Sequence, residues 1–360
     1  MAADVIESAP PRIAQAPRAG LIDRLLVFVD RLPGPAALTY LVIGIGLALV
    51  AHLVFWATAT FPVGTVSLNV LLPAFGIAWF GWLLSTLNRV ARETFDEFRP
   101  ALNDPASEEV YRHRLTSIRD RDAILAGLAT LAVIAVMYYG FVRQSVVTLP
   151  IEIESESISA PLWGAMGFVL GIVVLHTIVQ LRLVSHLSEV AGNVDIFSPA
   201  PINAFSRLTA VSALGLIAFV VAYMLYTPEQ PPAYVIQEIA LLTVAVGSFV
   251  LPLRVMNKRL VGEKRRLLGD AQDRLKAVLG RIHASVDAND LTNAEKLDHT
   301  LASIRSEIDV LDHLRTWPWS TATIRGFVTA LLLPIALIVF SQVVSRYLGV
   351  RAPPVRVKDR

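Results

Sequence analysis

The sequence predicts an all-α, polytopic membrane bundle of seven transmembrane helices, with a cytoplasmic antiparallel helical hairpin between helices six and seven. Three observations support this prediction. Hydrophobic residues make up 54% of the 360 residues and charged residues only 17%, whereas soluble domains carry about 25% charge. Seven segments are apolar over the roughly 20 helical residues that a bilayer requires. A long charged segment with helical periodicity separates the last two of them.

The chain begins with a predicted cytoplasmic tail, 1–36, that contains an amphipathic helix. In "LIDRLLVFVDRLP", residues 21–33, helical spacing separates the apolar side chains from the charged ones. Such a helix either lies flat among the lipid headgroups or packs on the bundle, and the sequence favours neither interpretation. Its apolar face consists of Ile22, Leu25, Leu26, Val29 and Leu32.

Six of the seven predicted spans form a membrane bundle within 37–256. Prolines occur in three spans, which membrane helices tolerate because neighbouring groups satisfy the carbonyl that each proline frees. A total of six spans would require the fifth or sixth segment to be re-entrant. Gly164, Gly167 and Gly171 follow one face of the fourth span and favour close packing within the chain. The spans are 37–59, 67–88, 122–142, 161–182, 207–226, 234–256 and 324–346.

Lysine and arginine residues set the expected orientation. With seven spans, 26 of the 32 basic residues fall on the side of the N-terminus. We therefore expect a multi-pass protein of the inner (plasma) membrane, with a cytoplasmic N-terminus and an external C-terminus. The basic external tail, 347–360, opposes this assignment and mildly favours an even number of spans. The six basic residues on the other side are Arg143, Arg346, Arg351, Arg356, Lys358 and Arg360.

The connecting segments differ in charge. The external loop 143–160 is acidic, whereas loop 88–121 contains a charged helix that begins near residue 106. The apolar face of that helix, Val110, Leu115 and Ile118, is expected to pack on the hairpin.

The hairpin is predicted over 257–320, with its first helix continuing from the sixth span without a break. The turn "SVDANDLTNAEK" contains Thr292 and Glu295 in a capping-box pattern that begins the second helix. The two helices either fold back on each other or pair with copies from other subunits. Apolar residues spaced by 3 and 4 form the expected seam, namely Leu268, Ala271, Leu275, Val278 and Ile282, followed by Ala294, Leu297, Leu301, Ile304, Ile308 and Leu311.

A Trp-Pro-Trp sequence, Trp317, Pro318 and Trp319, joins the hairpin to the seventh transmembrane helix, 321–346. Tryptophan prefers the membrane interface, and the residue before proline avoids helical geometry. The motif is therefore either an aromatic anchor that sets the depth of the seventh span, or a coupling elbow that transmits hairpin movement to it. In the second case, a change at Pro318 would rotate Arg325 toward new neighbours.

Polar side chains at membrane depth are the other candidate functional residues. They are His52 in the first span, His176 and Gln180 in the fourth, and Glu238 in the sixth. Each histidine is either a neutral, hydrogen-bonded core residue or a proton relay or ligand. Glu238 either lines an external vestibule or reaches the headgroups.

Several classes of chemistry lack their usual signatures. The chain has no cysteine, so disulfides, thiolate metal sites and cysteine nucleophiles are excluded. It has no HExxH motif, no P-loop and no histidine–carboxylate set with metal spacing. The basic residues are accounted for by membrane orientation, so nucleic acid is not an expected partner. We therefore expect no enzymatic activity, no cofactor and no bound metal.

The stretch "WPWSTATIRGFVTALLLPIALIVF", residues 317–340, resembles the ends of uncharacterised bacterial and archaeal multi-span proteins, which implies no activity. The overall layout is similar to that of the seven-transmembrane ion channels typified by insect gustatory and odorant receptors. That resemblance implies a last span that lines a pore and cytoplasmic helices that hold subunits together. The aromatic signature of the insect receptors is not matched, so no functional residue is carried over.

Three functions are compatible with these features. The favoured one is an oligomeric channel-like or sensory protein whose hairpin serves for assembly or coupling. The second is a membrane scaffold that recruits a cytosolic protein partner through the hairpin, and the third is a small-solute transporter. Central carboxylates and an internal repeat, which are typical of many transporters, are not found. The expected partners are thus the lipid bilayer, further copies of the chain and, for a scaffold, a cytosolic protein.

The orientation can be tested with reporter fusions. A reporter placed after Arg360 should be active only outside the cytoplasm, and one inserted near Asn289 only inside, because the basic residues are so unevenly distributed. If both reporters are active on the same side, the seven-span count is wrong.

Overall fold

A computed structural model describes residues 20–102, 108–142, 150–190, 197, 199–226, 232–289, 292–314, 316–317, 319 and 321–347. Pro318, residues 1–19 of the predicted N-terminal tail and residues 348–360 of the predicted C-terminal tail lie outside the described residues. Within the described part the protein is all-helical, as predicted. The elements are α1 Leu21–Asp30, α2 Ala36–Ala57, α3 Leu68–Phe98, η1 Arg99–Ala101, α4 Glu108–Thr116, α5 Asp120–Met137, the π-helical turn η3 Tyr138–Val142, α6 Pro150–Val190, α7 Pro199–Tyr226, α8 Pro232–Asp287, α9 Ala294–His313 and α10 Thr321–Tyr347.

Among the described residues, six helices are long and apolar enough to cross a membrane. They are α2, α3, α5, α6, α7 and α8, and each overlaps most of one of the first six predicted spans. The chain therefore has the helices of a multi-pass membrane protein. The seventh predicted span lies on α10, where the apolar stretch with described side chains, Ala322–Leu337, is shorter.

Two helices extend further than the hydropathy pattern predicts. α3 continues ten residues beyond the end of its predicted span, to Phe98. α6 begins at Pro150, inside the segment predicted as an acidic external loop, so the loop interpretation of 150–160 is wrong. Proline is favoured in the first turn of a helix, and acidic residues near an N-terminus stabilise the helix dipole. Glu152 and Glu154 follow Pro150 in the sequence and provide that charge.

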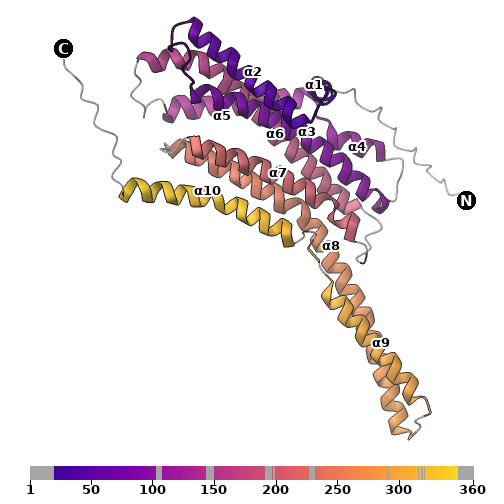
Figure 1. The fold of residues 1–360 in the computed structure, drawn as a ribbon. Helices are drawn as coiled ribbons and strands as arrows, with labels where there is room; N and C mark the ends of the chain where they lie inside the picture. The colour runs from indigo at the N-terminus through magenta and orange to yellow at the C-terminus, as the bar shows by residue number, and fades with distance from the viewer. Residues whose placement is uncertain are drawn as a thin grey trace, which may run out of the picture.

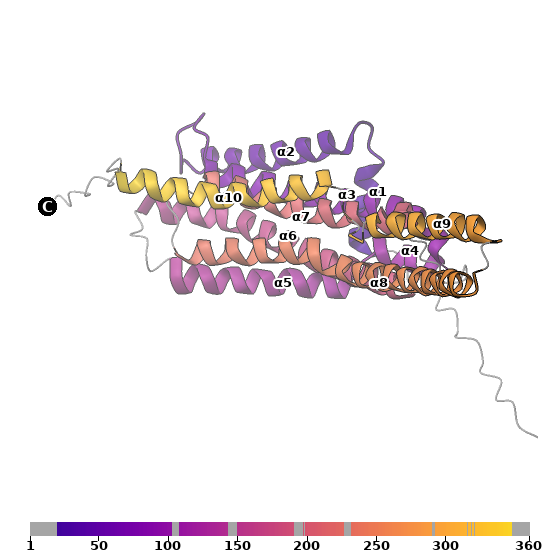
Figure 2. The same ribbon diagram turned by 90° about the horizontal axis from the view of Figure 1, so that it is seen from below.

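α3 lies at the centre of the bundle and packs against α2, α6 and α7, while α5 packs along α6 and α8 along α7 (Figures 1 and 2). The glycine face of α6 packs against α5, which confirms the prediction of contact within the chain. A Cβ atom on Gly171 would lie 2.6 Å from the carbonyl oxygen of Ala126, so only glycine permits this approach. The largest fully buried side chains include Phe80, Phe95, Phe98 and Phe205.

α1 packs on the bundle through one side and leaves apolar side chains exposed on another. Leu26 and Val29 are buried, whereas Leu25 and Phe28 are exposed. Ser85 of α3 donates a hydrogen bond of 2.6 Å to the carboxylate of Asp30 and so ties α1 to α3. Contact with the bundle is therefore established for α1, and its exposed apolar residues remain suited to lipid.

α4 packs on α3 and α6. Leu115 and Ile118 are buried there, which differs from the expectation that this apolar face would cover the hairpin. An ion pair between Arg112 and Asp96 and another of 2.8 Å between Arg99 and Glu108 attach α4 to the end of α3 and to η1. These two pairs explain why α4 remains beside the bundle.

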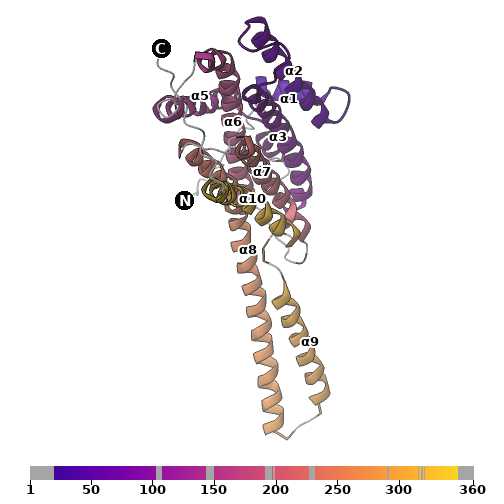
Figure 3. The same ribbon diagram turned by 60° about the vertical axis from the view of Figure 1, so that its left-hand side comes forward.

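α8 is one helix of 56 residues, as predicted, and crosses from the bundle into the hairpin. At ~1.5 Å per residue it is about 84 Å long. α9 runs back along its distal half, and the pair projects well beyond the bundle (Figures 1 and 3). In the predicted seam, Ala271, Val278, Ile304 and Leu311 are buried. The other seam residues are partly buried, except for the exposed Ala294.

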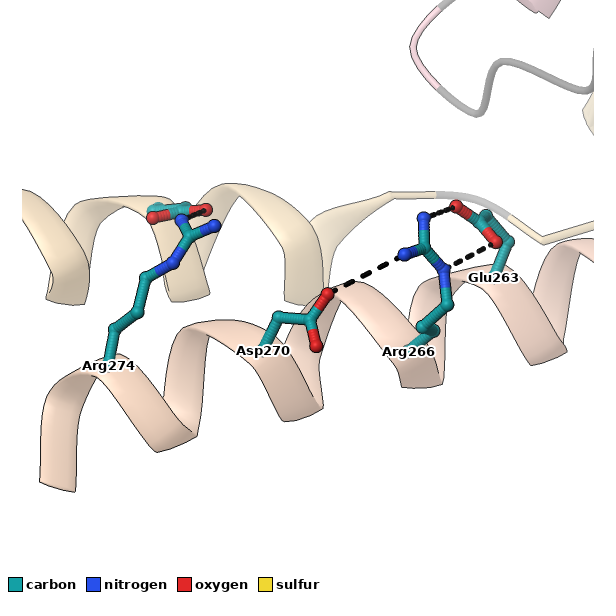
Figure 4. A network of polar contacts seen from close by, with 5 residues as sticks. Glu263, Arg266, Asp270 and Arg274 are labelled. Atoms are coloured by element: carbon teal, nitrogen blue, oxygen red, sulfur yellow. Dashed lines mark hydrogen bonds and ion pairs between the residues drawn. The ribbon is translucent and has the colours of Figure 1, made fainter. Parts of the chain in front are cut away.

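Polar contacts fix the register of the two hairpin helices. Arg274 of α8 forms an ion pair of 3.3 Å with Glu307 of α9. Arg266 lies between Glu263 and Asp270 on α8 (Figure 4), and its hydrogen bond holds the pKa of the Glu263 carboxyl below its usual value. Asn293, one residue after the predicted Thr292, is the N-cap of α9, and its side chain makes no capping hydrogen bond.

The seam can be tested by placing a charge in it. Ile304 is 7% exposed and Val310 on the same helix is 52% exposed. Ile304→Asp should destabilise the pairing of α9 with α8 by about 2–5 kcal/mol, because it removes buried apolar surface and adds an unpaired charge. Hydrogen exchange of the α9 amides in the full chain measures this loss. Val310→Asp is the matched control, and equal protection in the two variants would contradict the seam.

Candidate functional site

A cluster of polar side chains lies inside the apolar bundle where α3, α4 and α6 meet. We call Asn88, His176 and Gln180 the polar cluster. His176 and Gln180 are one turn apart on α6 and are 1% and 0% exposed, and Asn88 on α3 is also buried. An apolar environment penalises polar groups without hydrogen bonds. The role of this cluster therefore depends on which of its polar atoms have hydrogen-bond partners.

Hydrogen bonds connect the cluster to the end of α4. Nε2 of His176 lies 2.7 Å from Oδ1 of Asn88; since the amide oxygen only accepts, the histidine donates. Nε2 of Gln180 donates to the carbonyl oxygen of Leu115 at 2.7 Å and more weakly to Asn88 at 3.4 Å. Leu115 is in the last turn of α4, where carbonyl groups have no partner within the helix. Gln180 thus holds α4 against the bundle.

The same turn of α6 retains unused hydrogen-bonding capacity. Nδ1 of His176, Oε1 of Gln180 and Oγ1 of Thr177 are buried and have no hydrogen-bond partner among the described residues. Buried polar atoms of this kind usually bind water or another polar group. The polar cluster therefore combines hydrogen bonds that position α4 with buried polar atoms that have no partner among the described residues.

The two tryptophans of the Trp-Pro-Trp motif lie in different environments. Trp319 is 9% exposed, whereas Trp317 is 46% exposed. The Trp319 ring stacks on Phe249 of α8, with centroids 4.7 Å apart and planes 4° apart. Phe327 of α10 also stacks on Phe249, at 3.9 Å. We call Phe249, Trp317, Trp319 and Phe327 the aromatic stack.

The aromatic stack joins α8 to α10 across the end of the hairpin. Trp317 stacks on Trp319 at 4.9 Å and completes the series. The indole N–H of Trp319 is buried without an acceptor among the described residues, so stacking is achieved at the cost of an unsatisfied donor. Trp319 therefore serves as a contact between helices, while Trp317 has the exposure expected of an interfacial anchor. Pro318 lies outside the described residues, and the elbow remains a proposal.

The remaining predicted residues are not brought together with these groups by any described contact. Nδ1 of His52 donates to the carbonyl oxygen of Ala48 at 2.7 Å, and Nε2 accepts from the N–H of Ser67 at 2.9 Å. His52 is thus a neutral side chain that joins α2 to the start of α3. Glu238 of α8 is buried in the bundle. Arg325 is exposed on α10, where it lines a shallow hollow.

Sequence reasoning did not identify Asn88 and Phe249. Asn88 is the last residue of the second predicted span, and its amide at that position was a usable signal. Phe249 is one of many aromatic residues in an apolar segment, and nothing in its spacing distinguishes it. Comparison of the chain with protein-family models, curated proteins and solved structures found no match.

The role of Gln180 can be tested by an isosteric, apolar replacement. Gln180→Leu should destabilise the docked α4 by about 1–3 kcal/mol, because it leaves the Leu115 carbonyl buried without a donor. Hydrogen exchange over residues 108–116, together with the thermal unfolding midpoint in detergent, measures the effect. Gln272→Leu makes the same change at an exposed hairpin position. If both variants leave α4 equally protected, Gln180 does not hold it.

Proposed function

We propose that the protein crosses the membrane seven times and acts as an oligomeric sensory or channel-like protein, with the α8–α9 hairpin as its cytoplasmic assembly and coupling domain. One observation carries this proposal. α8 belongs to both the bundle and the hairpin, and the aromatic stack attaches it to α10 at the point where the two parts meet.

The seventh span is supported by the length of α10. α10 has 27 residues, or about 40 Å of helix, against a hydrocarbon core of about 30 Å. Six spans precede the hairpin, so the hairpin and the N-terminus share the basic, cytoplasmic side whether or not α10 crosses the membrane. In the structure α1, α4 and the hairpin lie toward the same end of the bundle, which agrees with this arrangement (Figures 1 and 2).

Coupling is supported by the contacts of the return segment between α9 and α10. Nζ of Lys264 donates to the carbonyl oxygen of Asp312, in the last turn of α9, at 2.7 Å and to that of Leu314, in the return segment, at 3.3 Å. Nδ2 of Asn257 donates to the carbonyl oxygen of Thr316 in the return segment at 2.9 Å. Both donors are on α8, so the return segment moves with this helix. A displacement of the hairpin is thereby passed to Trp319 and, through Phe249, to the start of α10.

Assembly is supported more indirectly. The layout is similar to that of seven-transmembrane ion channels in which cytoplasmic helices hold subunits together. The exposed faces of the projecting hairpin provide a surface for such contacts. The same surface suits the alternative of a scaffold, because the hairpin carries exposed apolar residues, Val286 and Val310, among its charges. A cytosolic partner is therefore the second candidate.

The proposal can be tested with purified protein in planar bilayers. Wild type should form an oligomer and give a conductance, and Trp319→Ala should change its gating much more than Trp317→Ala. The reason is that loss of a buried tryptophan costs about 3–5 kcal/mol of packing, whereas the exposed ring loses less. Conductance is absent if the protein is a scaffold, and a hairpin pull-down then retains a cytosolic protein. Saturable uptake into vesicles without conductance would indicate a transporter.

A further inference from the structure

α10 has a packed face and an outward face of different composition. Phe327 and Pro334 are buried against the bundle, while Arg325, Thr329 and Leu333 are exposed. On the outward face, alanine and glycine residues between larger side chains leave a shallow, open hollow that runs from Ala322 to Ala336. At ~1.5 Å per residue it extends about 21 Å along the helix, more than half of the ~30 Å hydrocarbon core. Apart from Arg325 and Thr329, its lining is apolar.

Arg325 gives this hollow a positive charge at one end. Its guanidinium is exposed and forms no ion pair or hydrogen bond within the described part of the chain. The first turn of α10 contains no acidic residue, so the partial positive charge of the helix N-terminus adds to that of Arg325. Asn257 places α8 beside the return segment, and Arg254 and Lys258 are exposed on that part of α8.

The depth of Arg325 matches that of lipid phosphates if α10 is the seventh span. It lies four residues, or about 6 Å, beyond the start of the helix. Trp317 and Trp319 precede that start, and tryptophan marks the level of the headgroups. An unpaired cation at this depth requires an anionic partner or a route to water. Beyond Arg325, at the depth of the lipid acyl chains, the lining of the hollow is apolar.

We propose that the outward face of α10 is a binding site for an anionic phospholipid of the cytoplasmic leaflet, with the phosphate on Arg325 and an acyl chain in the hollow. This inference rests on the proposed seventh span and deepens the sensory function, because the site adjoins the aromatic stack. A lipid bound here would lie on the face of α10 opposite Phe327, which stacks on Phe249 of α8.

A second copy of the chain fits this face less well. Subunits of a membrane oligomer share one orientation, so pairing through this face would place two Arg325 side chains at the same depth. Like charges in a poorly hydrated interface repel each other. A phosphate supplies the opposite charge, and basic pockets on the cytoplasmic side of membrane helices are suited to anionic headgroups.

Native mass spectrometry of the full chain in detergent tests the site. The protein is titrated with phosphatidylglycerol or with phosphatidylcholine of the same acyl chains, and retained lipids are counted. Wild type should retain phosphatidylglycerol preferentially. Arg325→Gln should weaken that binding about fivefold, the effect expected for one basic residue near a membrane surface. Arg325→Lys should retain most of it. Equal retention of the two lipids by wild type would overturn the proposal.

Two further variants separate the hollow from the charge. A Cβ atom on Gly326 meets nothing within 4 Å, so Gly326→Leu fills the hollow without disturbing the fold and should also weaken phosphatidylglycerol binding. Arg281→Gln removes an exposed charge from the hairpin and should have no effect. If Gly326→Leu instead changes the oligomeric mass and leaves lipid retention intact, the face is a subunit interface and the proposal is wrong.

A cysteine at position 336 distinguishes failure of the lipid site from failure of the seventh span. The chain has no native cysteine, so Ala336→Cys introduces a single thiol. In vesicles it should be protected from a water-soluble maleimide if α10 spans the membrane. A protected thiol with no lipid preference would refute the site alone. A fully reactive thiol would refute the span, and the site with it.

Discussion

Backbone groups at helix ends lack partners within their own helix, and in this protein side chains from other helices provide them. Gln180 of α6 donates to the last turn of α4, Arg259 of α8 to the last turn of α6, and Lys264 of α8 to the last turn of α9. At the other end of the molecule, His52 of α2 accepts from the N–H of Ser67. These contacts satisfy groups that the helices cannot, and each one also fixes where a helix ends relative to its neighbour. The polar residues of this chain therefore serve to set the relative positions of its helices.

α8 occupies a special place in this scheme because it makes such contacts in both parts of the molecule. Its membrane half packs on α7, and its distal half carries α9. Phe249 lies in the first half and receives the rings of Trp319 and Phe327. The segment that leads to α10 is thus attached to α8 by stacking and by the hydrogen bonds of Asn257 and Lys264. These contacts link the hairpin to the start of α10, while α10 also packs against α7. The unsatisfied indole N–H of Trp319 reduces the net stabilisation that stacking provides. A less stable junction between α8 and α10 can change its conformation more easily.

Much of the fold follows from the sequence because bilayer thickness and helical periodicity act on long segments. The first six spans, the unbroken α8 and most seam residues, such as Ile304 and Leu311, were predictable in this way. The helix ends were not, since α6 starts at Pro150 within a charged stretch and α4 is held by ion pairs to the end of α3 and to η1 and by the hydrogen bond from Gln180 of α6. For the site, hydropathy located His176 and Gln180 but not their partner Asn88, because the pairing depends on how three helices meet. The sequence likewise left the two tryptophans equivalent, whereas packing against Phe249 buries only Trp319.

The proposed coupling requires the aromatic stack to make the hairpin and α10 move as one unit. Spin labels on cysteines introduced at Gln272 and Ala336, both exposed positions in a chain without native cysteine, report the distance between them by pulsed electron resonance in lipid nanodiscs. We expect one narrow distance distribution in the parent, which stays narrow in Trp317→Ala and becomes broad in Trp319→Ala. A distribution that is equally narrow when Trp319 is replaced by alanine would show that the stack does not couple the two parts.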